Sequence, residues 1–425
     1  MSNEITNEPE IRFVGYEGDW ERRKFTDYFN FPVSTNSLSR AMLNYNNGEI
    51  KNIHYGDILI KYSTILNVKE DEIPYITGGE LEKYKSNLLE NQDLIFADAA
   101  EDESVGKAVE VSGITNENLV SGLHTIVARA KGEKDSFFWG YYINSDIYHR
   151  QLLRLMQGSK VSAISKGNLQ KTNVSFPNRM KEQQKVGAFF KKLDDTIALH
   201  QHELDLLEQI KQTYLQKMFP KTGEDKPEIR FAGFTDAWEQ RKLSEIINLI
   251  GGNAFSSSSA TEEGIPWLKI ANVGKNGINW NVQTFLPLEY WEIHSDYQLL
   301  PGDYVMALTR PILNHTLKIG MVDKQALLNQ RVAKLFFIIN KEFTFQLLQR
   351  RSIVDKIENE LAGTDPPNLG SKNLTNIDVM ITNNKYEAKR IGNFFCKFDN
   401  TITLHQRKLD SLKEMKKTLL QKMFV

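Results

Sequence analysis

The chain has 425 residues, 40% of them hydrophobic and 25% charged, and a net charge of −1, which excludes a disordered or collagen-like protein and predicts two or three folded cores. No apolar run approaches the roughly 20 residues that span a bilayer, and the first residues lack the apolar core of a secretory signal. The single cysteine, Cys396, allows neither an internal disulfide nor a cysteine zinc site, so we expect a cytoplasmic protein.

The first element along the chain is a short segment that occurs twice. Pro9-Glu10-Ile11-Arg12-Phe13 recurs at 227–231, and a matching Trp-Glu-x-Arg-Lys follows each copy, at 20–24 and 238–242. We therefore assign residues 1–24 to an N-terminal repeat segment and 220–242 to a linker with the second repeat segment. The second half of the chain restarts the pattern of the first.

Between the repeated parts lie two segments that match poorly, 25–177 and 243–382, and each is expected to be a mixed α/β domain. Runs typical of strands occur at 50–62, 119–130, 266–273, 304–309 and 334–339. Helical stretches come late in each segment, at 148–157 and 345–361. Two domains of one fold with different surfaces is the simplest interpretation.

The strongest helix signals are the segments 178–219 and 383–425. Residues 187–219 and 392–424 are identical at 20 of 33 positions with a constant offset of 205. Apolar residues recur in both with 4-3 spacing over four heptads, which predicts a coiled coil. With Asn178 and Asn383 as N-caps, each helix is expected to run for about 40 residues. The fold class is thus mixed α/β, with two domains joined by two long helices in a pseudo-two-fold arrangement.

Two polar residues interrupt the apolar seam of each helix at matching positions, namely His200 and Lys211 in the first and His405 and Lys416 in the second. Such residues usually set the register and the partner of a coiled coil at a cost in stability. The alternative for the histidine pair is a metal site, but no carboxylate or cysteine cluster in the sequence supports it.

No pattern of residues indicates catalysis. Walker A, His-Glu-x-x-His and nucleophile-elbow motifs do not occur. Asp365-Pro366-Pro367-Asn368 approaches the motif of amino-methyltransferases but has Asn in place of the aromatic residue that stacks on a flipped base. A proline-rich surface turn accounts for it better.

The charge pattern is compatible with a polyanion partner. The net charge of −1 argues against a nucleic-acid binder, but residues 150–192 carry ten Lys or Arg and one acid, while 69–110 carry four Lys and twelve acids. Such a chain can meet DNA on one side only. The alternative is solvated surface charge that happens to cluster.

Candidate DNA contacts lie in polar loops, for which ordinary surface loops are the alternative. The Gly158–Lys171 loop offers hydroxyl and ammonium groups suited to phosphate, and the loop at 363–374 corresponds to it. Two further loops could reach base edges. The candidates are Lys160, Ser162, Ser165 and Lys166 in the first loop, Ser371, Lys372 and Asn373 in its counterpart, and Ser37, Arg40, Ser256 and Ser257 in the others.

The doubled helix motif GxFFxxxDxTIxLHQxxLDxLxxxKxTxLQKMF, with Pro-Glu-Ile-Arg-Phe after the first copy, resembles specificity (S) subunits of type I restriction–modification systems. The stretches 253–257 and 264–272 resemble the opening of that family's target recognition domain, which adds Lys269 and Asn272 to the candidate DNA contacts. Leu38-Ser39-Arg40 followed by residues 53–59 resembles another version of the same opening.

The resemblance implies a non-catalytic DNA specificity subunit. Each recognition domain, 25–177 and 243–382, would read one half of a bipartite target in double-stranded DNA. The two helices would pair antiparallel and set the spacer. Two modification subunits would bring S-adenosylmethionine, and restriction subunits would bring ATP and Mg²⁺, so that this chain holds no cofactor or metal. The alternative function is a coiled-coil interaction scaffold that does not read DNA.

Overall fold

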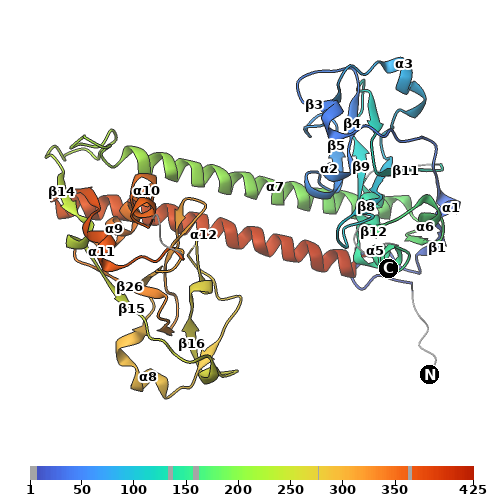
Figure 1. The fold of residues 1–425 in the computed structure, drawn as a ribbon. Helices are drawn as coiled ribbons and strands as arrows, with labels where there is room; N and C mark the ends of the chain where they lie inside the picture. Colours follow the sequence, from blue (N-terminus) through green and yellow to red (C-terminus); the bar gives the residue numbers. More distant parts are fainter. Residues whose placement is uncertain (1–6, 133–136, 157–161, 276, 362–365) are drawn as a thin grey trace. The chain divides into compact units, whose positions relative to one another are not determined.

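A computed structural model describes residues 7–132, 137–156, 162–275, 277–361 and 366–425. The chain divides into two compact units: unit 1 consists of Met1–Gln201 with Arg407–Val425, and unit 2 of His202–Gln406. The two long helices, α7 (Met180–Lys217) and α12 (Lys385–Lys422), each have 38 residues and contribute one part to each unit (Figure 1). Among the residues described, no helix is both long and apolar enough to cross a membrane.

The long helices begin one residue later than the predicted caps imply, at Met180 and Lys385. The side chain of Asn384 accepts hydrogen bonds from the backbone N–H groups of Tyr386 (3.0 Å) and Glu387 (3.3 Å), so Asn384 rather than Asn383 caps α12. The corresponding residue before α7 is Arg179, which has no side-chain acceptor. The predicted cap at Asn178 is therefore wrong as well, because a cap must directly precede the first helical residue.

Unit 1 contains a five-stranded sheet in the order β2-β11-β7-β9-β5, a four-stranded sheet in the order β10-β4-β6-β3, and two two-stranded ladders, β1-β13 and β12-β8. Its strands are β1 (Glu21–Lys24), β2 (Phe29–Asn30), β3 (Leu43–Asn44), β4 (Lys51–Ile53), β5 (Ile65–Asn67), β6 (Tyr75–Ile76), β7 (Leu94–Ala97), β8 (Ala99–Ala100), β9 (Ala108–Ser112), β10 (Leu119–Ser121), β11 (Thr125–Ala130), β12 (Ser162–Ala163) and β13 (Asn173–Phe176). Its short helices are α1 (Phe25–Tyr28), α2 (Tyr55–Ile60), α3 (Leu81–Tyr84), α4 (Phe138–Ile143), α5 (Asp146–Leu153) and α6 (Lys166–Gln170).

Unit 2 contains two four-stranded sheets, in the orders β15-β26-β21-β24 and β19-β16-β25-β20, and the ladders β14-β27, β17-β18 and β22-β23. Its strands are β14 (Glu239–Lys242), β15 (Ile247–Gly251), β16 (Ile265–Leu268), β17 (Val273–Gly274), β18 (Gly277–Ile278), β19 (Phe285–Leu286), β20 (Gln298–Leu299), β21 (Tyr304–Ala307), β22 (Ile312–Leu313), β23 (Thr316–Leu317), β24 (Ile319–Met321), β25 (Ala326–Leu328), β26 (Val332–Phe337) and β27 (Asp378–Ile381). Its short helices are α8 (Tyr290–Ile293), α9 (Lys341–Leu348), α10 (Arg351–Glu360) and α11 (Ser371–Thr375).

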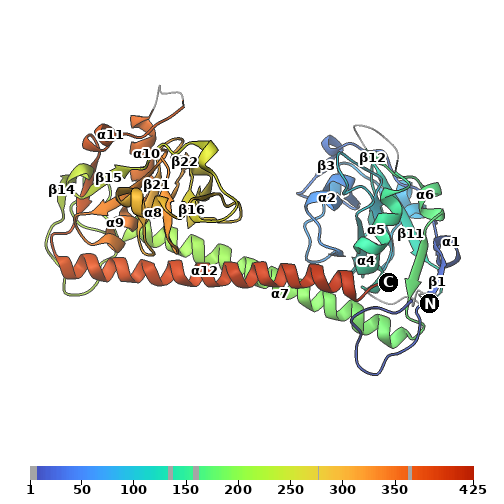
Figure 2. The ribbon, with the colours of Figure 1, turned by 90° about the horizontal axis from the view of Figure 1, so that it is seen from below.

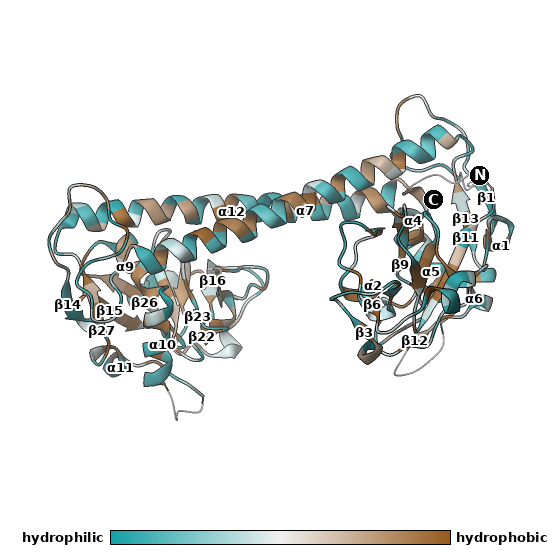
Figure 3. Cartoon of the chain, turned by 90° about the horizontal axis from the view of Figure 1, so that it is seen from above, coloured by the Kyte–Doolittle hydropathy of each residue, from teal (hydrophilic) through white to brown (hydrophobic). Residues whose placement is uncertain are grey.

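Several predicted strands prove to be composite. The run at 50–62 forms β4 and then helix α2, and the run at 119–130 forms two strands, β10 and β11. The helical stretch at 345–361 is divided between α9 and α10 at Gln349–Arg350. These differences arise because short apolar runs do not distinguish a buried strand from a buried helix. The mixed α/β character of segments 25–177 and 243–382, which we call the fillings, is confirmed, and Figures 2 and 3 show strands in each unit, many with hydrophobic residues.

A phenylalanine beyond the end of each long helix enters the core of a unit. In unit 1, Phe424 lies 6.2 Å from Trp20 and 5.5 Å from Phe190, measured between ring centroids. In unit 2, Phe219 lies 5.7 Å from Trp238 and 6.2 Å from Phe395. Phe424 and Phe219 are fully buried or nearly so. The repeated tryptophan and the repeated Met-Phe end are therefore core residues of the same kind in both units.

The Pro-Glu-Ile-Arg-Phe segment connects the ends of the long helices. In unit 1, Arg12 donates two hydrogen bonds to Glu182 in the first turn of α7, at 2.7 and 3.0 Å, and the Ile11 N–H donates to the carbonyl of Lys422 in the last turn of α12, at 3.0 Å. In unit 2, the equivalent contacts are Arg230 to Glu387 of α12, at 2.6 and 2.9 Å, and Ile229 to Lys217 of α7, at 2.8 Å. We call each of these two contact sets a clip. A clip joins the start of one long helix to the end of the other.

The clips are expected to be major contributors to stability. Arg230→Ala leaves the Glu387 side chain, which is 0% exposed, without its cation. Removing one partner of a buried ion pair costs about 3–5 kcal/mol, so we expect a loss of that size in the free energy of unfolding, measured by urea denaturation. Arg241→Ala is the matched control, because the Arg241–Glu239 pair of the same unit is about half exposed and such pairs contribute less than about 1 kcal/mol. Equal losses for the two variants would contradict a stabilising role for the clip.

Candidate nucleic-acid interface

The predicted register lysines form ion pairs between the two long helices. In unit 2, Lys211 of α7 forms an ion pair with Asp399 of α12 at 2.6 Å. In unit 1, Lys416 of α12 forms the equivalent ion pair with Asp194 of α7 at 2.5 Å. A second contact in each unit shows that the segments run antiparallel. In unit 2, Tyr214 lies after Lys211 on α7 but contacts Phe394, which precedes Asp399 on α12. In unit 1, Phe190 lies before Asp194 but contacts Phe424, which follows Lys416.

Each of these ion pairs is anchored to the domain of its own unit. Asp399 accepts a hydrogen bond from Gln346 of α9 at 2.6 Å, and Asp194 accepts one from the Tyr141 hydroxyl of α4 at 2.9 Å. Burial and the adjacent Asp194 carboxylate raise the pKa of Tyr141, so the hydroxyl remains a donor at neutral pH. Each lysine therefore fixes the helix partner and the helices' attachment to a domain at once.

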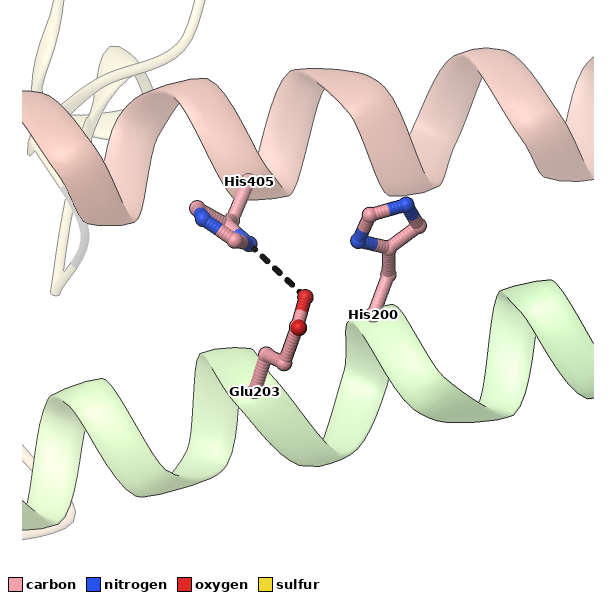
Figure 4. Close-up of side chains that lie close together, drawn as sticks. All are labelled: His200, Glu203 and His405. Carbon is pink, nitrogen blue, oxygen red and sulfur yellow. Dashed lines mark ion pairs between the residues drawn. The ribbon is translucent and has the colours of Figure 1, made fainter.

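The predicted register histidine of unit 2, His405, forms an ion pair with Glu203 of α7 at 3.5 Å when it is protonated (Figure 4). The imidazole is about one quarter exposed. His200 precedes Glu203 by three residues on α7, which places both on one face of that helix. The Glu203–His405 contact links α7 to α12, as a register-setting residue requires.

Among the candidate base-reading residues of unit 1, Arg40 is already engaged. It donates two hydrogen bonds to the buried Asp57 of α2, at 2.8 and 2.7 Å, and its side chain is 45% exposed. A guanidinium that holds a carboxylate in this way cannot also bind guanine with the same two donors. Ser37, three residues earlier, is exposed. The Arg40–Asp57 pair fixes the loop that carries Ser37.

The polar loop of unit 1 is partly a helix cap. Ser165 caps α6 in a capping box with Asn168, and the Asn168 amide donates to the carbonyl of Leu155 at 2.8 Å. Ser162 lies on strand β12 and is half-buried. Because Lys166 is exposed, its ammonium group is available to an anion. The ammonium lies 5.8 Å from the centroid of the Phe31 ring. Lys160 lies outside the described residues.

The corresponding loop of unit 2 has the same construction. The side chain of Asn373 accepts from the Gly370 N–H at 2.8 Å and donates to the carbonyl of Glu360 at 3.2 Å, as Asn168 does in unit 1. The Asn373 side chain is therefore engaged in holding the backbone of its own unit. Ser371 is the first residue of α11, and the neighbouring Lys372 is exposed.

The structure brings three candidates of unit 2 together on one aromatic cluster. Phe255, next to Ser256 and Ser257, packs against Trp267 at 6.0 Å between ring centroids, and the Lys269 ammonium lies 3.8 Å from the centroid of the same tryptophan. Both serines are exposed, and burial lowers the pKa of Lys269. This surface offers two hydroxyls and one ammonium group beside an aromatic platform.

Asn272 is not exposed, contrary to the expectation for a DNA contact. It is 5% exposed, and its amide donates to the carbonyls of Asn279 and Val282 at 3.0 and 2.9 Å, while its oxygen accepts from the Lys269 N–H. The reason is that the loop after β16 needs a partner for its own backbone groups. Asn272 therefore shapes the loop that presents Lys269.

Sequence reasoning missed the carboxylates that hold these cations, namely Asp57, Asp194 and Asp399. A signal for two of them existed, because Asp194 and Asp399 are identical at the repeat offset of 205 and stand among the repeated residues. Asp57 had a weaker signal, because Gly56-Asp57 recurs as Gly302-Asp303, but no pattern in the sequence connects it with Arg40, which lies 17 residues away.

A family model described as "Type I restriction modification DNA specificity domain" matches residues 17–209 and 235–414. Among curated proteins, the type I restriction enzyme MjaVIII specificity subunit of Methanocaldococcus jannaschii is 27% identical over 273 residues, which cover 62% of this chain and 64% of that protein. The EcoAI specificity subunit of Escherichia coli is 34% identical over 118 residues, 27% of this chain and 19% of that protein. The chain thus spans less than two thirds of the length of either relative.

Solved structures support the same fold. The type I restriction–modification S subunit from M. genitalium matches 98% of this chain and 99% of its own, with a TM-score of 0.64 and 14% identity. The similarity at this level of identity concerns the fold alone.

The lysine–aspartate pairs predict a charge-swap result. Lys211→Asp places a carboxylate against Asp399 in a site where the lysine is 8% exposed, so we expect strong destabilisation of unit 2. The double variant Lys211→Asp/Asp399→Lys restores opposite charges, and we expect it to recover much of the lost melting temperature in thermal denaturation. Lys397→Asp, at an exposed position of α12, is the control for charge reversal. A double variant no more stable than Lys211→Asp would contradict direct pairing.

Proposed function

The chain belongs to the type I restriction–modification DNA specificity family, and we propose that it is the non-catalytic subunit that selects the DNA sequence for such a system. The observation that carries this proposal is a set of contacts that is repeated in both units, which we call the frame, around two fillings that differ. The clips, the lysine–aspartate pairs and the aromatic cores occur once in each unit with equivalent residues. The segments between them differ in sequence and in sheet order.

Each filling presents its own polar surface, which supports two different half-sites. Unit 2 offers Ser256, Ser257 and Lys269 around Trp267, and unit 1 offers Ser37 and the exposed Lys166 on other elements. Hydroxyl and ammonium groups of this kind bind phosphate oxygens and base edges. We propose that residues 25–177 read one half of a bipartite target and residues 243–382 the other.

The helix pair is proposed to set the spacer between the half-sites and to bind two modification subunits. α7 and α12 each continue from one unit into the other, so their length limits the separation of the two readers. In this proposal the modification subunits supply S-adenosylmethionine and the methyl transfer, and the restriction subunits supply ATP- and Mg²⁺-dependent cleavage. The net charge of −1 favours partners that contribute to DNA affinity.

Mapping methylated adenines tests the proposal directly. DNA exposed to this chain with its cognate modification subunits should carry methyl groups at one bipartite, asymmetric sequence. Exchange of residues 25–177 for the matching segment of another specificity subunit should change one half of that sequence and keep the other. Methylation that ignores the exchange would favour the alternative, a coiled-coil scaffold that does not read DNA.

The exposed lysine of α6 is expected to contact phosphate. Lys166→Gln should weaken DNA binding by the assembled complex about equally for all sequences and lower the slope of log K against log salt concentration by about 1. Lys69→Gln is the matched control, because Lys69 is also exposed in unit 1 but lies in the acidic segment. An unchanged salt slope for Lys166→Gln would remove this residue from the interface.

The helices are expected to act as a ruler. Insertion of four residues after Leu204 lengthens α7 by about 6 Å, so we expect the preferred spacer to grow by about two base pairs at 3.4 Å per step. The readout is the spacer of the methylated sequence. Loss of all specificity with an intact, folded complex would contradict the ruler.

A further inference from the structure

Unit 2 contains a cavity of about 450 Å³ that plays no part in the proposed DNA contacts. It lies between the end of α7, the linker after Phe219, the start of α10 and strand β27. Four cationic side chains line it, namely Lys221, Arg350, Arg351 and Lys356. Two carboxylates, Asp355 and Asp378, line it as well.

Both carboxylates are already paired with other cations. Asp355 pairs with Arg351 at 2.7 Å, and Asp378 pairs with Lys242 at 2.9 Å. Arg350 and Lys356 instead donate to backbone carbonyls, of Pro220 at 2.9 Å and of Asp378 at 2.7 Å. Neither forms an ion pair with a carboxylate of the described residues. The Arg350 charge is thus available to an anion, while the Lys356 ammonium, without a direct ion pair, helps Lys242 to lower the pKa of the Asp378 carboxyl group.

Arg350 is the more unusual of the two. It is 8% exposed, and its guanidinium lies 5.0 Å from the centroid of the Phe219 ring. Burial lowers its pKa to about 10, so it remains a cation at neutral pH. A guanidinium has five N–H donors, and burying a charge without an opposite charge costs free energy. An anion in the cavity would offset that cost.

Unit 1 shows that the frame does not need these charges. At the repeat offset of 205, the residues equivalent to Arg350 and Lys356 are Ser145 and Gln151. Ser145 caps α5 as Arg350 precedes α10, and the Gln151 amide donates to the carbonyl of Asn173 at 3.0 Å. Asn173 corresponds to Asp378, so a neutral side chain makes the same bond that Lys356 makes in unit 2. Unit 1 thus has neutral side chains at both equivalent positions, so the shared fold does not require the charges of Arg350 and Lys356.

We propose that this cavity binds a carboxylate of a partner polypeptide, an Asp or Glu side chain or a chain terminus, through Arg350 and Lys356. A phosphate of duplex DNA is the less suitable occupant, because a duplex presents a broad surface and a guanidinium this buried is reached only by a group that projects from its chain. Part of the wall is formed by the end of α7 and the linker after it, which lie outside the segment 243–382 proposed to read DNA. Arg can bind a carboxylate through two N–H donors, and Lys356 would add a third contact.

The inference rests on the proposed assembly with two modification subunits, and it predicts that the two subunits bind with different contacts. Identical partners present the same acidic group to both units, but only unit 2 carries the cations that would bind it. One of the two binding steps should therefore depend on Arg350 and Lys356, and the other should not.

The test uses full-length protein and the cognate modification subunit in isothermal titration calorimetry. Arg350→Ser and Lys356→Gln each introduce the residue that unit 1 has at the equivalent position, so we expect both variants to fold. Thermal denaturation checks that they do. We expect each variant to weaken one of the two binding steps about tenfold and to leave the other unchanged. Lys397→Gln, with the same charge change at an exposed position of unit 2, should bind like the original protein.

Folded variants that bind both modification subunits with unchanged affinity would overturn the proposal. Variants that assemble normally but lose affinity for DNA in the complex would also overturn it, and would identify phosphate as the occupant. If the original protein binds no modification subunit, the proposed assembly fails and this inference fails with it. If the original protein binds two modification subunits and the variants bind them with the same affinities, the proposed assembly stands and the cavity has no part in it.

Discussion

The structure depends on one buried ion pair made twice, Arg12 with Glu182 and Arg230 with Glu387. Each glutamate lies in the first turn of a long helix and is almost inaccessible to water, so the arginine is the group that compensates its charge. The same short segment donates a backbone hydrogen bond to the last turn of the other helix. A helix start and a helix end are thereby held together, which makes an antiparallel pairing the arrangement that satisfies both clips.

The clips matter because everything else in a unit is placed by the helix ends. Phe219 and Phe424 follow the last helical turn and enter the aromatic cores beside Trp238 and Trp20. The lysine–aspartate pairs lie further along the helices and reach α9 in unit 2 and α4 in unit 1 through a second contact on the aspartate. Long charged helices contribute little stability by themselves, so tertiary packing at their ends decides where the two α/β domains attach.

The duplication also separates residues that maintain the frame from residues that serve function. Asn168 and Asn373 occur at equivalent positions and make equivalent bonds to the backbone, so these two residues of the polar loops hold the start of a helix in place. The ammonium groups of Lys166, which is exposed, and of Lys269, which is half-buried, make no such bonds to the backbone and lie beside aromatic rings. Arg350 and Lys356 stand out in the same comparison, because their counterparts in unit 1 are neutral.

The sequence by itself determined the duplicated frame, the two long helices and the mixed α/β fillings, because heptad spacing and exact repetition are local patterns that survive without knowledge of contacts. It also singled out Lys211 and Lys416, since a charge in an apolar seam is visible in one dimension, and their role in setting the register stays a prediction. Only the tertiary structure decided which cations are free. Arg40 is bound by Asp57, Asn272 is buried beneath its loop, and Arg350 lines a cavity whose two carboxylates pair with other cations. In each case the partner depends on residues brought together by folding. Hydrogen bonds and charge pairs act over a few ångströms in space, so no spacing along the chain can reveal them.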